Sequence, residues 1–467
     1  MPQSRTSGAS PLVGLLIVLV TLLVVISDWG GSAFVGMVTP VATVALALVL
    51  AFKVRAARLA FILAAAGLTV AVAILHDDWQ DDVLRGLGVT AFIVAFFSAL
   101  ATLRNAAQTS PAIRTCGAFL ASQPPGRRYA ALSVGGQLFS LLLNYGAIAL
   151  LGSLAATSAR EEPDLEIRTI RLRRMLLAIQ RAMVSTLPWS PLSFSIAIST
   201  ALIPGTAWAS VVVPSLVSGL ILVGTGYAMD TLFKPRLNRP RPQPRKVEGG
   251  WSSLYPLLML LAILFGLVGV LHVATGVRTV GVVTLVVPLV SLLWIGAQAE
   301  PGNRVRHMVS RSREYVRSEL PSYRGEITLL SMAGYIGTLG GVLLAPWIAE
   351  AGISFETIPT AAILVGLIWI FPIAGQFAMN PLLAASLLLP LLPTPAAMGI
   401  SPTALQVAVT AGWALTGACS PFTATTIITG SFADKSAWHV GLRWNGLYTV
   451  LCALVLSGWV LVYAYVL

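Results

Sequence analysis

Two stretches of the sequence carry the same hydroxyl-rich pattern, 230 positions apart. Residues 190–208 read SPLSFSIAISTALIPGTAW and residues 420–438 read SPFTATTIITGSFADKSAW, without a gap. Five of the nineteen positions are identical, and four more exchange serine and threonine. A proline removes one backbone hydrogen bond from a helix, so each copy should break an apolar helix. The free N–H groups and positive partial charge at the start of each second half could bind an anion.

Hydroxyl groups line both predicted breaks, and one asparagine precedes each of them. An asparagine can cap a half-helix, give its carbonyl oxygen to a cation, or give its amide to an anion. The predicted substrate ligands are Asn144, Ser190, Ser193, Ser195, Asn380, Ser420, Thr423 and Thr425. Oxygen atoms also suit a coupling cation, for which the predicted ligands are Asn144, Ser199, Asn380, Thr426 and Thr429. Alternatively, the hydroxyls only bond to nearby carbonyls or hold helices together, and the asparagines are caps without a ligand.

The composition requires a membrane environment for these segments. Hydrophobic residues make up 56% of the chain and charged residues 10%, against about 25% charged residues in a soluble domain. A span needs about 20 apolar helical residues. This rule predicts an all-α polytopic membrane protein with eleven transmembrane helices, at about 10–28, 32–52, 57–76, 84–103, 183–203, 207–229, 251–273, 279–297, 326–348, 404–430 and 440–466. Two further apolar stretches, 129–156 and 357–395, contain internal breaks and predict re-entrant hairpins at about 129–156 and 373–395.

The basic residues give this topology a direction. With the N-terminus in the cytoplasm and the C-terminus outside, only Arg85 and Arg278 of the thirty basic residues fall outside. Cytoplasmic loops are rich in basic residues, so the net charge of +12 needs no nucleic-acid partner. Residues 163–181 predict a helix lying in the membrane interface, or else a solvated linker helix. The basic linker 233–250 should lie near anionic lipid headgroups.

The internal repeat divides the chain into two halves. Asn144 and Asn380 are 236 positions apart, and the same offset aligns SALATL at 98–103 with GYIGTL at 334–339. The predicted organisation begins with an extra N-terminal helix (1–30) and a first repeat of five spans (31–232) with a broken helix at 183–203. A linker (233–250) then leads to a second repeat of five spans (251–467) with a broken helix at 404–430. Because five is odd, the repeats should have inverted topology, as in many transporters whose sites lie at interrupted helices.

This arrangement resembles the ion transporter superfamily, and in architecture it is most similar to the divalent anion/sodium symporter family. FSLLLNYGAIALLG resembles the tip of the first hairpin of that superfamily and GQFAMNPLLAASLLLPLLP the tip of the second, while the two Ser-Pro segments correspond to its broken fifth and tenth helices. That family carries Ser-Asn-Thr at both tips, whereas only the asparagines match here. The resemblance implies a homodimer with an elevator mechanism, and sodium bound near each tip.

The predicted function is a secondary-active transporter of a small anionic solute, such as a carboxylate or oxyanion, in a bacterial-type inner membrane. No nucleotide-binding, catalytic or metal-ligand motif is present in the sequence, so we expect neither an enzyme nor a cofactor, apart from Na⁺ as a coupling ion. Three alternatives remain open: the membrane subunit of a binding-protein-dependent (TRAP-like) carrier, a membrane-embedded transferase, and a non-transporting membrane scaffold.

Overall fold

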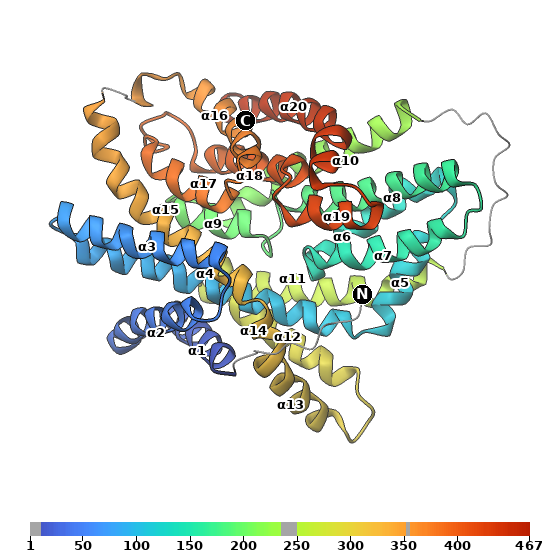
Figure 1. Cartoon of the computed structure of the whole chain (residues 1–467), viewed down its shortest axis with the longest axis horizontal. Helices are drawn as coiled ribbons and strands as arrows, with labels where there is room; N and C mark the ends of the chain where they lie inside the picture. The colour runs from blue at the N-terminus through green and yellow to red at the C-terminus, as the bar shows by residue number, and fades with distance from the viewer. Residues whose placement is uncertain (1–10, 235–249, 352–354) are drawn as a thin grey trace. The chain divides into compact units, whose positions relative to one another are not determined.

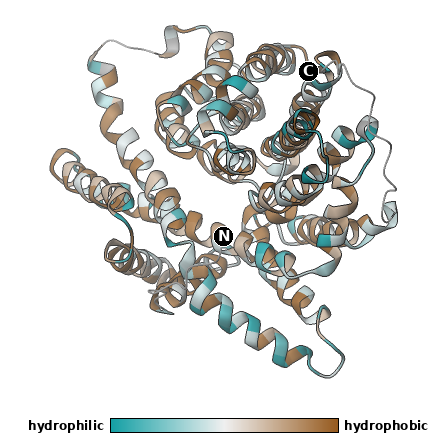
Figure 2. Ribbon diagram, turned by 45° about the vertical axis from the view of Figure 1, so that its right-hand side comes forward, coloured by the Kyte–Doolittle hydropathy of each residue, from teal (hydrophilic) through white to brown (hydrophobic). Residues whose placement is uncertain are grey.

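A computed structural model describes residues 11–234, 250–351 and 355–467, and every regular element within those ranges is a helix (Figure 1). Almost all of the predicted linker 233–250 lies outside the described residues. Helices satisfy their own backbone hydrogen bonds, which is the requirement for crossing lipid. The chain is therefore an all-helical polytopic membrane protein, and hydrophobic residues cover its long helices (Figure 2).

Nine of the described helices are long and apolar enough to cross a membrane, and each overlaps one predicted span. They are α1 (Pro11–Asp28), α2 (Ala33–Ala51), α3 (Ala56–Leu75), α4 (Trp79–Gln108), α10 (Trp208–Leu232), α11 (Tyr255–Thr275), α12 (Thr279–Ala297), α15 (Arg324–Glu350) and α20 (Gly446–Tyr465). The other two predicted spans, 183–203 and 404–430, are each interrupted in the structure.

The described helices form two compact units, and each unit takes helices from both predicted repeats. The first unit contains α1–α4, α12, α15, α13 (Arg304–Glu314), the π-helix η2 (Tyr315–Glu319), α14 (Leu320–Ser322) and most of α17 (Pro381–Leu388). In this unit α15 approaches α17 so closely that a Cβ on Gly337 would overlap Ser386. The short helix η4 (Leu389–Leu391) also belongs to it, whereas the residues of α11 and of η3 (Phe355–Thr357) are divided between the two units.

The second unit contains both interrupted spans. Its helices are α5 (Pro111–Ala121), α6 (Pro125–Leu143), α7 (Gly146–Arg160), α8 (Leu165–Thr186), α9 (Phe194–Leu202), α10, α16 (Thr360–Gln376), α18 (Pro402–Cys419), α19 (Ala424–Ala433), the π-helix η5 (His439–Trp444) and α20, with the short η1 (Trp251–Leu254). Helices α6, α7 and α19 pack on α8, whereas α9, α16 and α20 pack on α18 (Figure 1). This unit therefore holds most of the predicted site.

Three elements differ from the prediction in length or position. Helix α8 runs without interruption from its cap at Asp164, whose side chain accepts two backbone N–H groups, so the predicted interface helix and the start of span five are one helix. Residues 377–380 join α16 to α17, and α16 begins at Thr360, before the predicted hairpin start at residue 373. Helix α5 begins with a proline at its first position, which favours helix initiation, and lies in a stretch read from sequence only as a basic loop.

Candidate substrate site at two broken helices

Both Ser-Pro segments interrupt a helix, as the sequence predicts. Helix α8 ends at Thr186 and α9 begins at Phe194. Helix α18 ends at Cys419 and α19 begins at Ala424. The predicted breaks are confirmed, and each leaves one helix C-terminus facing one helix N-terminus across a few residues.

In the first break, serine hydroxyls compensate for the proline. Pro191 lacks the N–H that would bond to the carbonyl of Leu187 in a continuous helix. The hydroxyl of Ser195 donates to this carbonyl, and Ser193 Oγ lies 2.9 Å from the same oxygen. Ser190 Oγ accepts the backbone N–H two residues later at 3.2 Å. The carbonyl that proline leaves without a partner is therefore satisfied from within the segment.

The second break repeats most of this pattern, although only one described hydroxyl reaches its freed carbonyl. Pro421 frees the carbonyl of Gly417, and the hydroxyl of Thr425 donates to it. Thr423 Oγ1 lies 2.9 Å from Thr425 Oγ1, which matches the 3.1 Å between the corresponding serine hydroxyls in the first break. Ser420 Oγ accepts the backbone N–H two residues later at 3.3 Å. The weak sequence repeat is therefore a true structural repeat at these segments.

The two broken helices cross antiparallel at equivalent positions. A Cβ on Gly417 would lie 3.3 Å from Leu187 Cδ1, and these two residues are 230 positions apart, which is the repeat offset. Near the start of α18, Gln406 Nε2 donates to Ser199 Oγ at 3.0 Å and to Thr200 Oγ1 at 2.8 Å, near the end of α9. Contact between equivalent residues is the mark of a two-fold relation. The prediction of antiparallel copies is confirmed for these segments.

Most of the predicted ligand hydroxyls bond within their own segments. Ser199 Oγ donates to Ser195 O at 2.6 Å, and Thr426 Oγ1 donates to Ser420 O at 2.7 Å. Thr429 differs, because its hydroxyl is fully buried and makes no hydrogen bond. These side chains therefore shape the breaks, as in the alternative reading from sequence, and a ligand would meet mainly hydroxyl lone pairs and backbone N–H groups.

The two predicted asparagines are placed differently. Asn144 joins α6 to α7 with a positive φ of 50°, and its Oδ1 is buried without a hydrogen bond. In the second pair the positive φ, 63°, belongs to Ala378, while Asn380 is half-buried directly before α17. Asn144 therefore forms the turn itself, whereas Asn380 follows a turn made by other residues.

A glutamine that is not among the predicted site residues lies beside the second break. Gln376, at the end of α16, donates Nε2 to Cys419 Sγ at 3.3 Å, and its Oε1 is buried without a hydrogen bond. Ser420 Oγ donates to Gly375 O at 2.6 Å and so fixes α16 to the break. A polar amide within the apolar stretch 357–395 was the signal that could have identified Gln376.

The second unit also contains a buried arginine with neutral partners. Arg181 is 5% exposed, donates Nε to Asn445 Oδ1 at 3.0 Å and Nη1 to the Tyr129 hydroxyl at 3.3 Å, and lies 4.2 Å from the centre of the Tyr448 ring. No carboxylate among the described residues is within ion-pair distance of Arg181. Since Arg181 precedes Leu187 by six residues on α8, it lies about 9 Å along the helix axis from the break. In sequence Arg181 belongs to a basic stretch predicted to be cytoplasmic, and it is not among the predicted site residues.

Two solved structures are similar to this chain in fold. The chain is similar to the YdaH transporter of Alcanivorax borkumensis, with a TM-score of 0.54 and 14% identity over 87% of this chain and 98% of that one. The chain has the fold of a membrane transporter. It is also similar to Neisseria gonorrhoeae MtrF, described within a class of antimetabolite efflux pumps, with a TM-score of 0.50 and 13% identity over 89% and 96% of the two chains. No protein-family model matches the sequence, and no curated protein matches it either. At these identities the likeness concerns the fold.

Proposed function

We propose that this chain is a secondary-active transporter of a small anionic solute, a carboxylate or an oxyanion. The observation that carries the proposal is the antiparallel crossing of two broken helices, because the contact of Gly417 with Leu187 brings together the two interruptions, after which α9 and α19 begin. Helix N-termini offer free N–H groups and a positive partial charge. Neither interruption, 187–193 or 420–423, contains a carboxylate, so nothing there opposes an anion.

Arg181 supports an anionic solute independently of the helix ends. Arg181 is a buried cation, and a buried charge without an opposite charge beside it is costly. The neutral partners of Arg181 leave its positive charge uncompensated by any described carboxylate. In a low-dielectric interior this charge attracts an anion over a longer distance than it would in water. The solute would therefore be drawn toward the break from the α8 side.

Unpaired oxygen atoms in the same unit suit a coupling cation. Asn144 Oδ1, Gln376 Oε1 and Thr429 Oγ1 are buried and have no hydrogen-bond partner. Hard cations such as Na⁺ prefer oxygen ligands. We include Na⁺ as a co-transported ion, with Asn144 and Thr429 as ligands already proposed from sequence and Gln376 as an addition.

An elevator mechanism and a homodimer complete the proposal, in line with the resemblance to divalent anion/sodium symporters. Both broken helices, the first helical pair and α16 belong to one compact unit, while α1–α4 and α12–α15 belong to the other. Such a division is what a moving transport domain and a stationary scaffold require. The protein would work in a bacterial-type inner membrane with its N-terminus in the cytoplasm.

Solute counterflow in proteoliposomes tests the proposal directly. Vesicles containing purified protein are loaded with one of a panel of carboxylates and oxyanions, and entry of the same labelled solute is followed with and without Na⁺. Because one similar structure is described as an efflux pump, both directions of the gradient are measured. Alanine at Ser190, Ser420, Asn144 and Asn380 together should abolish counterflow while the protein remains folded. Unchanged counterflow would remove these residues from the site.

The same measurement separates the remaining alternatives. A carrier that depends on a binding protein would show transport only after that protein is added. A transferase would release a new lipid-linked product that mass spectrometry detects, without any counterflow.

A further inference from the structure

A hollow of about 290 Å³ lies between α1 and η2 in the first unit. It is lined by Pro11, Leu15, Arg313, Val316 and Arg317. Three of these residues are apolar and two are cationic. The hollow therefore combines an apolar wall with two guanidinium groups four positions apart on one helical segment.

A glycine fixes the wall of this hollow. A Cβ on Gly14 would overlap the carbonyl oxygen of Val316, so α1 and η2 approach each other more closely than any other residue would permit. The hydroxyl of Tyr315 donates to Ser98 O at 3.0 Å and anchors η2 to α4. π-Helical turns such as η2 occur frequently at functional sites.

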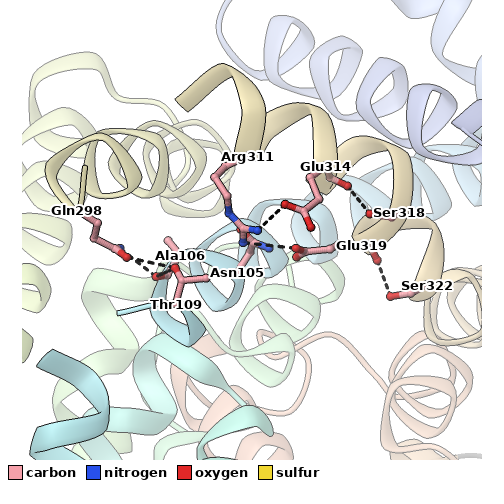
Figure 3. A network of polar contacts seen from close by, with 9 residues as sticks. All are labelled: Asn105, Ala106, Thr109, Gln298, Arg311, Glu314, Ser318, Glu319 and Ser322. Carbon is pink, nitrogen blue, oxygen red and sulfur yellow. Dashed lines mark hydrogen bonds and ion pairs between the residues drawn. The ribbon is translucent and has the colours of Figure 1, made fainter. Parts of the chain in front are cut away.

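A neighbouring arginine, Arg311, forms ion pairs with Glu314 and Glu319. Arg311 donates to Glu314 at 2.7 Å, to Glu319 at 3.4 Å and to Asn105 Oδ1 at 3.2 Å, and it lies at the centre of the polar network in Figure 3. Arg313 and Arg317 are exposed, and neither forms an ion pair with a described acidic residue. Their guanidinium groups are available to an anion from outside the chain.

We propose that this hollow binds the headgroup phosphate of an anionic phospholipid. Guanidinium groups match phosphate oxygens in charge and geometry. Pro11 and Leu15 belong to the first turns of a membrane-length helix, which is where a headgroup meets the acyl region. Leu15 is 58% exposed and Leu12 51% exposed on the same helix, so acyl carbons have an apolar surface to follow. A free phosphate would leave this apolar wall uncovered.

Native mass spectrometry of the full-length protein tests this site. The protein is equilibrated with equal parts of phosphatidylglycerol and phosphatidylcholine, and the ratio of the two retained lipids is measured. Wild type should retain phosphatidylglycerol preferentially, and R313A/R317A should lower this preference about 30-fold, because each cationic residue near an anionic leaflet contributes roughly fivefold. R304A/R306A removes the same charge from α13 without touching the hollow and should preserve most of the preference.

A second pair of variants tests the hollow apart from its charge. Leu15→Trp fills the apolar wall and should lower phosphatidylglycerol retention, whereas Leu12→Trp, which does not line the hollow, should not. Equal losses for both arginine pairs, or full retention by Leu15→Trp, would overturn a defined lipid site. Thermal stability in detergent with inorganic phosphate identifies the source of the phosphate group. Protection by inorganic phosphate through Arg313 and Arg317 would mean that the ligand is not a lipid.

Discussion

The two carbonyls left without partners by proline are satisfied unequally, and this difference can be measured. In the first break the carbonyl of Leu187 has two hydroxyls within hydrogen-bond distance, Ser193 and Ser195. In the second break the carbonyl of Gly417 has one described side-chain donor, Thr425. Thr425→Val therefore leaves a buried carbonyl without that donor, whereas Ser195→Ala leaves the hydroxyl of Ser193 in place. The two substitutions are equivalent in sequence but should differ in cost.

The expected magnitudes follow from the two kinds of loss. An ordinary hydrogen bond contributes about 0.5–1.5 kcal/mol net, whereas a buried polar group left unpaired costs about 1–3 kcal/mol. Ser195→Ala should therefore lower the free energy of unfolding by about 1 kcal/mol and Thr425→Val by about 2 kcal/mol. The double variant S193A/S195A removes both donors from the first carbonyl and also the Ser193 cap of α9, so its cost should exceed that of Thr425→Val.

Unfolding in mixed micelles with increasing dodecyl sulfate, followed by tryptophan fluorescence and circular dichroism, measures these differences where both signals report one transition. Thr429→Val is a matched control, because it deletes a hydroxyl from the same helix at a fully buried position where that hydroxyl has no partner. It should be neutral or stabilising. An equal cost for Thr429→Val would show that hydroxyl loss in α19 is harmful for some other reason.

A double-mutant cycle with proline decides the mechanism. Pro421→Ala restores an N–H that can bond to the carbonyl of Gly417, so Thr425→Val should cost less in that background than alone. The reasoning is refuted if Ser195→Ala costs as much as Thr425→Val, or if the cost of Thr425→Val is the same with and without Pro421. The same variants assayed for counterflow report whether the break itself is needed for transport.

Three further predictions concern other parts of the chain. Arg181→Gln should raise the half-saturating concentration of an anionic solute about tenfold or more without equal loss of folding, while Arg181→Lys retains part of the affinity, as measured by counterflow. Gly375→Ala places a Cβ 2.6 Å from the Thr416 side chain and should cost about 1–3 kcal/mol, whereas Gly366→Ala in the same helix meets nothing within 4 Å and should be neutral. Burial raises the pKa of Glu319 despite its bond to Arg311, so the folded state keeps the proton of the Glu319 carboxyl to higher pH than the unfolded chain does. Stability therefore falls as pH rises through that pKa. Glu319→Gln should remove this dependence of the free energy of unfolding on pH, measured across mildly acidic pH.

The breaks could be predicted because their cause is local. A proline frees the carbonyl four residues before it, and a hydroxyl four residues after it reaches that carbonyl in both copies. The placement of Pro191 and Ser195 therefore contains the geometry, and the same reasoning applies to Pro421 and Thr425. The turn between α16 and α17 could not be predicted in this way, because its positive φ falls on Ala378. Alanine rarely adopts a positive φ, and Asn380, the residue that the sequence suggests, lies two positions later.

Arg181 was missed because its environment is tertiary. In sequence it belongs to a run of arginines that includes Arg173 and Arg174, and a basic run before a span indicates the cytoplasm. The structure separates these residues, since Arg174 pairs with Asp230 at 2.5 Å whereas Arg181 is buried against Asn445. The neutral neighbours of Arg181, which are Asn445, Tyr129 and Tyr448, come from helical segments distant in sequence. The division into two units is likewise a result of packing and has no local signal.

The repeat supplies the shape of the site twice, but its charge only once. The position equivalent to Arg181 in the second copy is Ala411, and the position equivalent to Gln406 in the first copy is Leu176, as the offset of 230 shows. All four residues are buried, so the two copies differ in polarity inside the protein and not on its surface. The two halves of the crossing are therefore alike in backbone and unlike in polarity. A site built in this way presents a positive charge from the α8 side and amide and hydroxyl groups from the α18 side. An elongated solute with one anionic end would have a preferred orientation there, so counterflow should distinguish a monoanion with a polar tail from a symmetric dianion of the same length.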